Sequence, residues 1–94
     1  MNWSGRNVLI TGGAGHIGSH LVAELVKLGA NVRIADNLWR GKKEYLFDKS
    51  GKPIIDFEKN FLELDLREMK NCEKAVSGMD TIFHLADVVA GIDF

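Results

Sequence analysis

Cysteine is almost absent from this 94-residue sequence, and the sequence contains no long hydrophobic run. The single thiol, Cys72, cannot form a disulfide within the chain and offers no paired-cysteine metal spacing, so it is expected to be reduced and structural. The longest apolar stretches fall far short of the roughly 18 residues that a membrane span needs. The first residues also lack the hydrophobic region of a signal peptide. These absences favour a cytoplasmic protein with no membrane partner.

An excess of charge is missing as well. The sequence has 12 Lys and Arg against 13 Asp and Glu, for a formal net charge of -1. This balance gives no electrostatic reason to expect a nucleic acid partner. The three histidines are not at metal-ligand spacing with any acid or thiol, so no metal site is predicted. The length fits one small domain, or a piece of one, of marginal stability.

Hydrophobic patterning predicts a strand, a helix and a second strand in the first 36 residues. Residues 8–10 form a continuous apolar run, which is typical of a parallel strand covered on both faces. Residues 15–28 then have helical periodicity, and Gly29 is a natural helix stop. The apolar side of this helix is expected to carry Ile17, Leu21, Leu25 and Leu28. Residues 31–36 form the second strand, which completes a βαβ unit.

The remainder of the chain predicts two further strands and one further helix. Residues 37–53 are polar and read as a surface loop with a short helix near residues 43–47. A third strand is expected over residues 61–64, a helix over 67–76, and a fourth strand over 81–85. The helix should place Met69, Cys72 and Val76 along one side. The predicted fold class is therefore α/β, a partial Rossmann fold with about four parallel strands in the order 3-2-1-4 and flanking helices.

A glycine-rich turn joins the first strand to the first helix. Gly12, Gly15 and Gly18 follow a G-x-x-G-x-x-G spacing. Gly12 permits a tight turn with a positive backbone dihedral. Gly15 lets a diphosphate approach the main chain, and Gly18 lets the helix pack closely. Because the motif follows a predicted strand and opens a predicted helix, it predicts a dinucleotide site at the helix N-terminus.

Two other interpretations of this turn are open. A purely structural glycine-rich turn would have the same spacing and bind nothing. A P-loop would also hold phosphates, but it requires a Gly-Lys-Ser/Thr that the sequence does not have here.

Asp36 lies 18 residues beyond Gly18, at the end of the second predicted strand. A carboxylate in this place can accept hydrogen bonds from both hydroxyls of an adenosine ribose. A 2′-phosphate would instead meet a like charge, at a cost of roughly 4 kcal/mol per charge pair at about 4 Å and an effective dielectric near 20. NAD is therefore the predicted cofactor, and NADP is disfavoured. Arg40, Lys42 and Lys43 are nearby cations that would serve a 2′-phosphate.

These residues resemble the extended short-chain dehydrogenase/reductases, and specifically the NAD-dependent nucleotide-sugar epimerase/dehydratase family. Residues 11–20 resemble that family's cofactor turn, although its usual Phe or Tyr is His16 here. The pair Asp36-Asn37 resembles its ribose-binding segment, and Asp65-Leu66 resembles the pair beside adenine. Residues 82–86 resemble its fourth strand, after which Asp87 departs from the usual small residue. Locally, residues 61–67 and 86–94 are most similar to GDP-mannose 3,5-epimerase-like members.

The resemblance implies a role for each matched position. The diphosphate would lie along the glycine-rich turn, the ribose beside the second strand, adenine beside the third, and the nicotinamide half beside the fourth. The implied cofactor-binding residues are, in that order, Gly12, Gly15, His16, Ile17 and Gly18, then Asp36, Asn37 and Arg40, then Asp65 and Leu66, then Leu85 and Ala86. A nucleotide sugar is the implied substrate of a full-length relative.

The family's catalytic Tyr-x-x-x-Lys helix is not recognised in the sequence. Tyr45 and Lys49 have the right spacing, but they fall in the predicted loop on the adenosine side, so the match is interpreted as coincidence. Residues 1–94 are thus expected to be the N-terminal part of an NAD(P)-binding domain, inactive alone and with no catalytic residue. A non-catalytic NAD-binding or interaction module, and a folded remnant that binds nothing, are the alternatives.

Two further expectations concern the fourth strand. His84 is expected to pack in the core. The apolar edge of this strand would lack a neighbour, which favours self-association of the chain.

Overall fold

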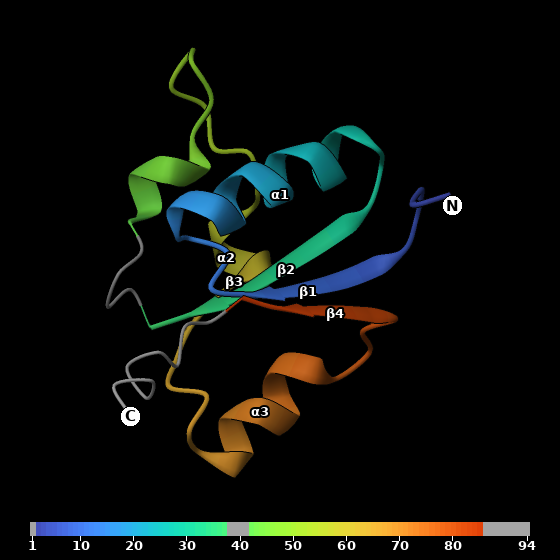
Figure 1. Ribbon diagram of the computed structural model, residues 1–94, viewed down its shortest axis with the longest axis vertical. Coiled ribbons are helices and arrows are strands. Elements are labelled where there is room, and N and C mark those ends of the chain that lie inside the picture. Colours follow the sequence, from blue (N-terminus) through green and yellow to red (C-terminus); the bar gives the residue numbers. More distant parts are fainter. Residues whose placement is uncertain (1, 38–41, 86–94) are drawn as a thin grey trace.

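The computed structural model describes residues 2–37 and 42–85 and contains one parallel sheet between helices (Figure 1). The strands are β1 (Asn7–Thr11), β2 (Asn31–Asp36), β3 (Phe61–Glu63) and β4 (Thr81–His84). They are hydrogen-bonded in the order β3-β2-β1-β4, and every neighbouring pair is parallel. The predicted fold class and strand order are confirmed.

The two longer helices lie on opposite faces of the sheet (Figure 1). They are α1 (His16–Lys27), between β1 and β2, and α3 (Met69–Val76), between β3 and β4. The predicted short helix is present as the 3-10 helix η1 (Lys43–Leu46). In residues 2–37 and 42–85, no helix has the length and hydrophobicity to cross a membrane.

A four-residue helix, α2 (Phe57–Asn60), precedes β3 and was not predicted. The carboxylate of Asp56 caps it by accepting hydrogen bonds from the N–H groups of Glu58, at 2.9 Å, and Lys59, at 3.3 Å. Aspartate is a favoured residue at this position because its oxygen satisfies the first free N–H groups of a helix. Asp56 was therefore the signal that could have identified α2.

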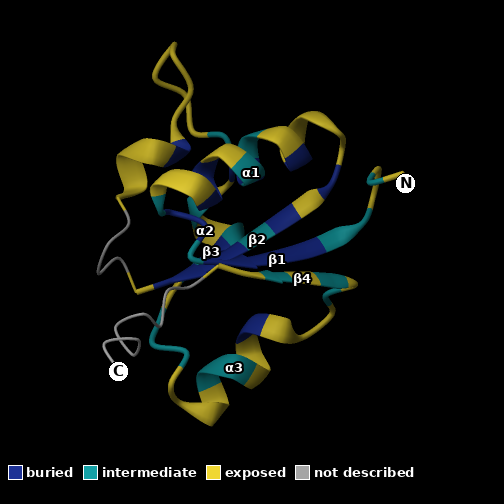
Figure 2. Ribbon diagram, viewed as in Figure 1, coloured by how far each residue is buried: buried dark blue, intermediate teal, exposed yellow. Residues whose placement is uncertain are grey.

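The core lies on both faces of the sheet, as Figure 2 shows by the buried colouring of β1 and β2. Successive side chains of a strand point to opposite faces. Val8 and Ile10 pack in the larger cluster, with Val22 and Leu25 of α1. Leu9 packs in the smaller cluster, with Ala75 of α3 and Ala35 of β2. Cover on both faces explains why the β1 run is continuously apolar.

The predicted buried side of α1 is only partly right. Leu25 is buried and Leu21 packs against the larger cluster, but Ile17 is 75% exposed and Leu28 is 54% exposed. The buried side runs instead through Gly18, Ser19, Val22 and Leu25. The reason is that α1 approaches the glycine-rich turn at Gly18, which rotates Ile17 outward.

The side of α3 that carries Met69, Cys72 and Val76 is not its buried side. Met69 is 73% exposed and Val76 is 41% exposed, while Cys72 is half-buried. The residue that α3 buries completely is Ala75. A small side chain at this position lets the helix lie close to Leu9 and Ala35 of the sheet.

Arg33, which interrupts the apolar run of β2, ties that strand to the end of α3. Its guanidinium donates hydrogen bonds to the carbonyl oxygens of Ala75, at 2.9 Å, and Ser77, at 2.8 Å. The last carbonyls of a helix have no partner within the helix and carry its partial negative charge. Arg33 therefore caps α3 from the neighbouring sheet.

Replacing Arg33 with methionine is expected to lower the free energy of unfolding by about 1–2 kcal/mol, because two charge-assisted hydrogen bonds are lost. Urea denaturation followed by circular dichroism measures this. The matched control is Lys27→Met, which removes an exposed cation paired with Glu24 at 3.8 Å and should change stability by less than about 0.5 kcal/mol. Equal stability of the two variants would contradict the capping role.

β4 forms the edge of the sheet, where it pairs with β1. Phe83 faces the larger cluster and meets the ring of Trp3 at 6.0 Å between centroids. On the other face, Ile82 is 48% exposed. Among the residues that the structure describes, this edge thus presents apolar surface and an open row of backbone groups.

Candidate dinucleotide-binding site

The glycine-rich turn connects β1 to α1 at the carboxyl end of the sheet. Gly12 has the predicted positive φ, 76°. Its N–H donates to the carbonyl of Ala35 at 2.9 Å, and its own carbonyl accepts from the N–H of Gly15 at 3.0 Å. These bonds attach the turn to the end of β2 and close it on itself.

Gly18 makes the close approach that its position predicts. A Cβ added there would lie 2.3 Å from the carbonyl oxygen of Gly12 and 3.0 Å from the Cα of Gly13. The backbone that Gly18 approaches is therefore the turn rather than the strand itself. Gly15 is less crowded, with an added Cβ at 3.3 Å from the same oxygen.

The N-terminus of α1 presents backbone N–H groups at this turn. Gly15 is its N-cap, and neither a capping side chain nor a first-turn acid is found among the described residues. The first helical hydrogen bond runs from the N–H of Ser19 to the carbonyl of Gly15 at 2.8 Å. The N–H groups of His16, Ile17 and Gly18 therefore have no carbonyl within the helix, and they favour an anion at this end.

Asp36 stands at the end of β2 beside the turn. It is only 8% exposed, and one carboxylate oxygen, Oδ2, accepts a hydrogen bond from the N–H of Ala14 at 2.9 Å. Its backbone carbonyl accepts from the N–H of Leu64 at 3.2 Å, which links it to the segment after β3. Asn37 follows at the surface. The structure thus brings the predicted ribose-binding carboxylate into contact with the predicted diphosphate turn.

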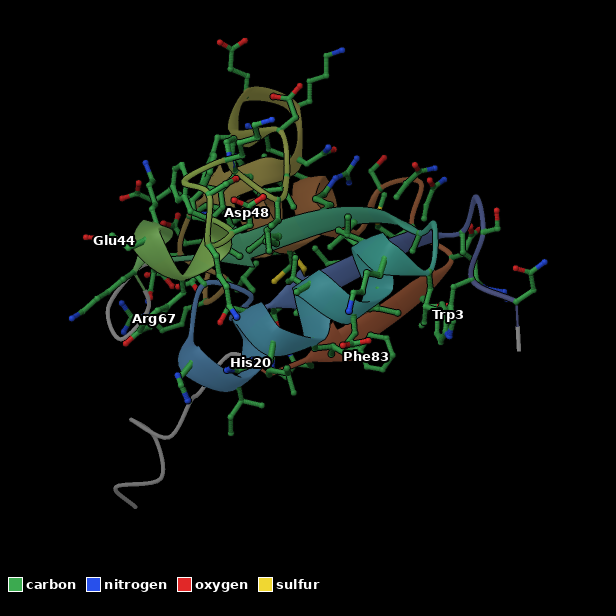
Figure 3. All side chains as sticks on the ribbon, turned by 90° about the horizontal axis from the view of Figure 1, so that it is seen from above. Trp3, His20, Glu44, Asp48, Arg67 and Phe83 are labelled. Atoms are coloured by element: carbon green, nitrogen blue, oxygen red, sulfur yellow. The ribbon has the colours of Figure 1, made fainter. Side chains whose placement is uncertain are left out.

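Asp65 and Leu66 follow the end of β3, at the carboxyl edge of the sheet where Asp36 also lies. Leu66 is half-buried and packs against the smaller cluster. Asp65 pairs with Arg67, whose Nη2 lies 2.8 Å from Oδ2 of the carboxylate. Figure 3 shows Arg67 at one end of the molecule and Trp3 at the opposite end.

The Arg67 hydrogen bond to Asp65 lowers the pKa of that carboxyl below its ordinary value of 3.8, helped by the Arg67 backbone N–H. Because the pKa of Asp65 is lower in the fold, the pair with Arg67 stabilises the folded state at a pH above the ordinary pKa. This contribution is lost as the pH falls through the lowered pKa. An NMR titration of the carboxyl carbons should give Asp65 a midpoint below 3.8.

In Arg67→Gln the Asp65 midpoint should rise. The pKa of Asp48 is lowered mainly by the hydroxyl of Ser50 and does not involve Arg67, so its midpoint is the internal control. An unchanged Asp65 midpoint in the variant would contradict this assignment.

His84 is exposed at the end of β4, so its predicted place in the core is wrong. Its Nδ1 lies 2.8 Å from Oγ1 of the buried Thr11, at the end of β1. His84 lies on the face that α3 covers, but α3 packs against Leu9 and Ala35 of the two central strands. β4 is the edge strand, so the helix leaves His84 open at its end. The next residue, Leu85, is 40% exposed and donates its N–H to the carbonyl of Thr11 at 3.0 Å.

Two side chains missed by sequence reasoning surround His16. The His16 ring makes edge contacts with His20, at 5.0 Å between centroids, and with Tyr45 of η1, at 5.8 Å. η1 is held there by a hydrogen bond from the N–H of Lys42 to the carbonyl of Ala14, at 3.0 Å. His16 and His20 are four residues apart on α1, a spacing that could have signalled their contact. No local spacing signals the contact with Tyr45, because it joins segments separated by β2.

Tyr45 and Lys49 do not share a helix. η1 ends at Leu46, and Lys49 lies in the exposed turn that follows. This geometry supports the interpretation of their spacing as coincidence. Arg40 and Ala86, the two remaining predicted cofactor residues, lie outside the described residues.

The predicted site residues that the structure describes therefore gather at one edge of the sheet, where parallel strands end. Thr11 is in register with Ala35 of β2 and with His84 of β4, and Asp36 is in register with Glu63 of β3. Ligands of open α/β sheets bind outside the carboxyl ends of the strands, where the strand order reverses. In this sheet that position lies between β1 and β4, next to the glycine-rich turn.

Comparisons with known proteins agree with this geometry. Residues 8–94 match the model of the NAD dependent epimerase/dehydratase family. A UDP-N-acetyl-alpha-D-glucosaminuronate decarboxylase of Bacillus cytotoxicus is 40% identical over 85 residues, which cover 89% of this chain and 24% of the relative.

Solved structures show the same similarity. An epimerase from Methanothermobacter thermautotrophicus superposes with a TM-score of 0.72 at 33% identity, covering 89% of this chain and 23% of that one. The Bordetella bronchiseptica enzyme WbmF, solved in complex with NAD+ and UDP, gives 0.68 at 31% identity, covering 88% and 23%. The chain thus spans about a quarter of the length of these relatives. It belongs to the NAD-dependent epimerase/dehydratase family.

Proposed function

We propose that this chain binds NAD along the carboxyl edge of its sheet, as the nucleotide-binding part of a nucleotide-sugar epimerase or dehydratase. One observation carries the proposal: the buried carboxylate of Asp36 contacts Ala14 within the glycine-rich turn. This contact sets a ribose acceptor and the N–H groups of α1 at adjacent positions, as an adenosine diphosphate requires. The NAD+ complex of the related WbmF supports the same choice of cofactor.

The proposed assignment follows the strands. The α1 N-terminus and the turn hold the diphosphate, Asp36 and Asn37 the adenosine ribose, and the residues after β3 the adenine. Leu85, beside the end of β1, faces the nicotinamide half. The full proposed set is Gly12, Gly15, His16, Ile17, Gly18, Asp36, Asn37, Asp65, Leu66 and Leu85, with Arg40 and Ala86 added by family resemblance alone.

Calorimetric titration with NAD and NADP in parallel tests the cofactor. NAD should bind, and NADP at least about tenfold more weakly, because its 2′-phosphate meets the Asp36 carboxylate. Binding of neither dinucleotide would contradict the proposed function, and a preference for NADP would contradict the role of Asp36. Comparable affinity for both would mean that cations after β2 offset the repulsion.

We further propose that the chain alone has no epimerase or dehydratase activity. The chain spans only about a quarter of the relatives, and the two residues of its one Tyr-x-x-x-Lys spacing, Tyr45 and Lys49, do not share a helix. Incubation with NAD and a UDP-sugar should give no turnover. Adding the separately produced remainder of a relative should restore turnover if the chain is an enzyme part. Without restoration, a non-catalytic NAD-binding module would be favoured.

The exposed edge of β4 leads us to propose that the chain self-associates. Strand pairing between two copies would satisfy the open backbone groups and cover Ile82, which is 48% exposed. Light scattering at increasing concentration should detect a dimer or a larger species. Ile82→Lys, which places a charge on this edge, should shift the mass towards the monomer. A monomer of the unchanged chain at all concentrations would contradict self-association.

A further inference from the structure

The side chain of Asp36 reaches from the end of β2 back to the glycine-rich turn. Its Oδ2 accepts the N–H of Ala14 at 2.9 Å, and this contact is buried, since Ala14 is 0% and Asp36 8% exposed. A buried N–H without an acceptor is costly, so the carboxylate is required by the turn itself. This requirement exists before any ribose is present.

Ala14 is held on its other side as well. Its carbonyl accepts the N–H of Lys42 at 3.0 Å, while the next N–H, that of Gly15, donates to Gly12 at 3.0 Å. The two peptide units that flank the Ala14 Cα are therefore held by Asp36, at the end of β2, and by Lys42, in the segment that follows β2. These units come immediately before the N–H groups of His16, Ile17 and Gly18, and they set the direction in which those groups point.

We infer that Asp36 is a positioning residue for the diphosphate-binding turn, in addition to its proposed contact with ribose. This inference rests on the proposed function. If Asp36 only recognised the ribose, a ligand without ribose hydroxyls would bind independently of Asp36. A ligand that keeps the adenine and the diphosphate but lacks both ribose hydroxyls still depends on Asp36, through Ala14.

Titrations with ADP and with 2′,3′-dideoxy-ADP separate the two roles. Asp36→Ala should weaken 2′,3′-dideoxy-ADP about tenfold, because the turn loses a charge-assisted hydrogen bond. Asp36→Asn keeps an oxygen that can accept from Ala14, and it should stay within about threefold of the unchanged chain for this ligand. The control Asp48→Ala lies in an exposed turn away from the site and should bind as the unchanged chain does. Equal affinity of Asp36→Ala and the unchanged chain for dideoxy-ADP would overturn the inference.

NMR of the ligand-free chain gives a readout that does not depend on binding. The Ala14 amide should exchange with solvent about tenfold faster or more in Asp36→Ala, and near the original rate in Asp36→Asn. In the unchanged chain, a scalar coupling across the hydrogen bond should connect the Ala14 nitrogen to the Asp36 carboxyl carbon. This coupling decides the matter if Asp36→Ala does not fold, and its absence would overturn the inference. If neither nucleotide binds the unchanged chain, the proposed function fails while the amide data still decide the positioning role.

Discussion

Replacing Gly18 with alanine is expected to abolish NAD binding and to lower the free energy of unfolding by about 3 kcal/mol. The added Cβ would lie 2.3 Å from the Gly12 carbonyl oxygen and 3.1 Å from its carbon. These are backbone atoms, so no rotamer change relieves the overlap. Either α1 moves away from β1 or the turn changes shape, and both displace the N–H groups proposed to hold the diphosphate.

Calorimetric titration with NAD and urea denaturation measure the two effects of Gly18→Ala. Gly51→Ala is the matched control, because an added Cβ there meets nothing within 4 Å, although Gly51 has a positive φ of 86°. That control should cost about 1 kcal/mol of stability and leave NAD binding unchanged. Gly18→Ala with full affinity for NAD would show that the tight packing of helix on turn does not matter for the ligand.

Asp36→Ala is expected to lower NAD affinity about 100-fold, equivalent to about 3 kcal/mol, because charge-assisted bonds to ribose hydroxyls are lost. The loss for NADP should be much smaller, because removing the carboxylate also removes its repulsion of the 2′-phosphate. The preference for NAD should therefore largely disappear.

Parallel titrations of the variant with NAD and NADP give this result as a ratio of two Kd values. A ratio has the advantage that a general loss of folded protein cancels. Asp48→Ala, which removes an exposed carboxylate from the turn after η1, should keep the original ratio. A ratio unchanged by Asp36→Ala would mean that a group other than Asp36 discriminates between the 2′-hydroxyl of NAD and the 2′-phosphate of NADP.

The strands were predictable because each has a short apolar run bounded by glycine or polar residues, continuous in β1 and interrupted by Arg33 in β2. β2 has the predicted bounds, residues 31–36, β1 extends one residue beyond the predicted range at each end, and β4 ends one residue earlier than predicted. The helix faces were not predictable to the same degree. Spacing indicates that α1 is amphipathic, but two adjacent apolar stripes fit it, and the choice is made by the contact of Gly18 with Gly12.

The candidate site also has a part that was predictable from the sequence and a part that was not. The glycine spacing and the carboxylate at the end of β2 are local signals, and they identified the turn and Asp36 from the sequence. The bond from Ala14 to Asp36 and the contact of Tyr45 with His16 join residues 22 and 29 positions apart. Such contacts depend on how the segment after β2 returns to the turn, which no local pattern encodes. His84 was misplaced because its environment depends on β4 being an edge strand.

A crystal structure of the chain with NAD tests the central claim most directly. The diphosphate should lie against the N–H groups of His16, Ile17 and Gly18, and the adenosine ribose hydroxyls should lie within hydrogen-bond distance of Asp36. A dinucleotide bound elsewhere on the sheet, or a glycine-rich turn left empty at saturating NAD, would contradict it.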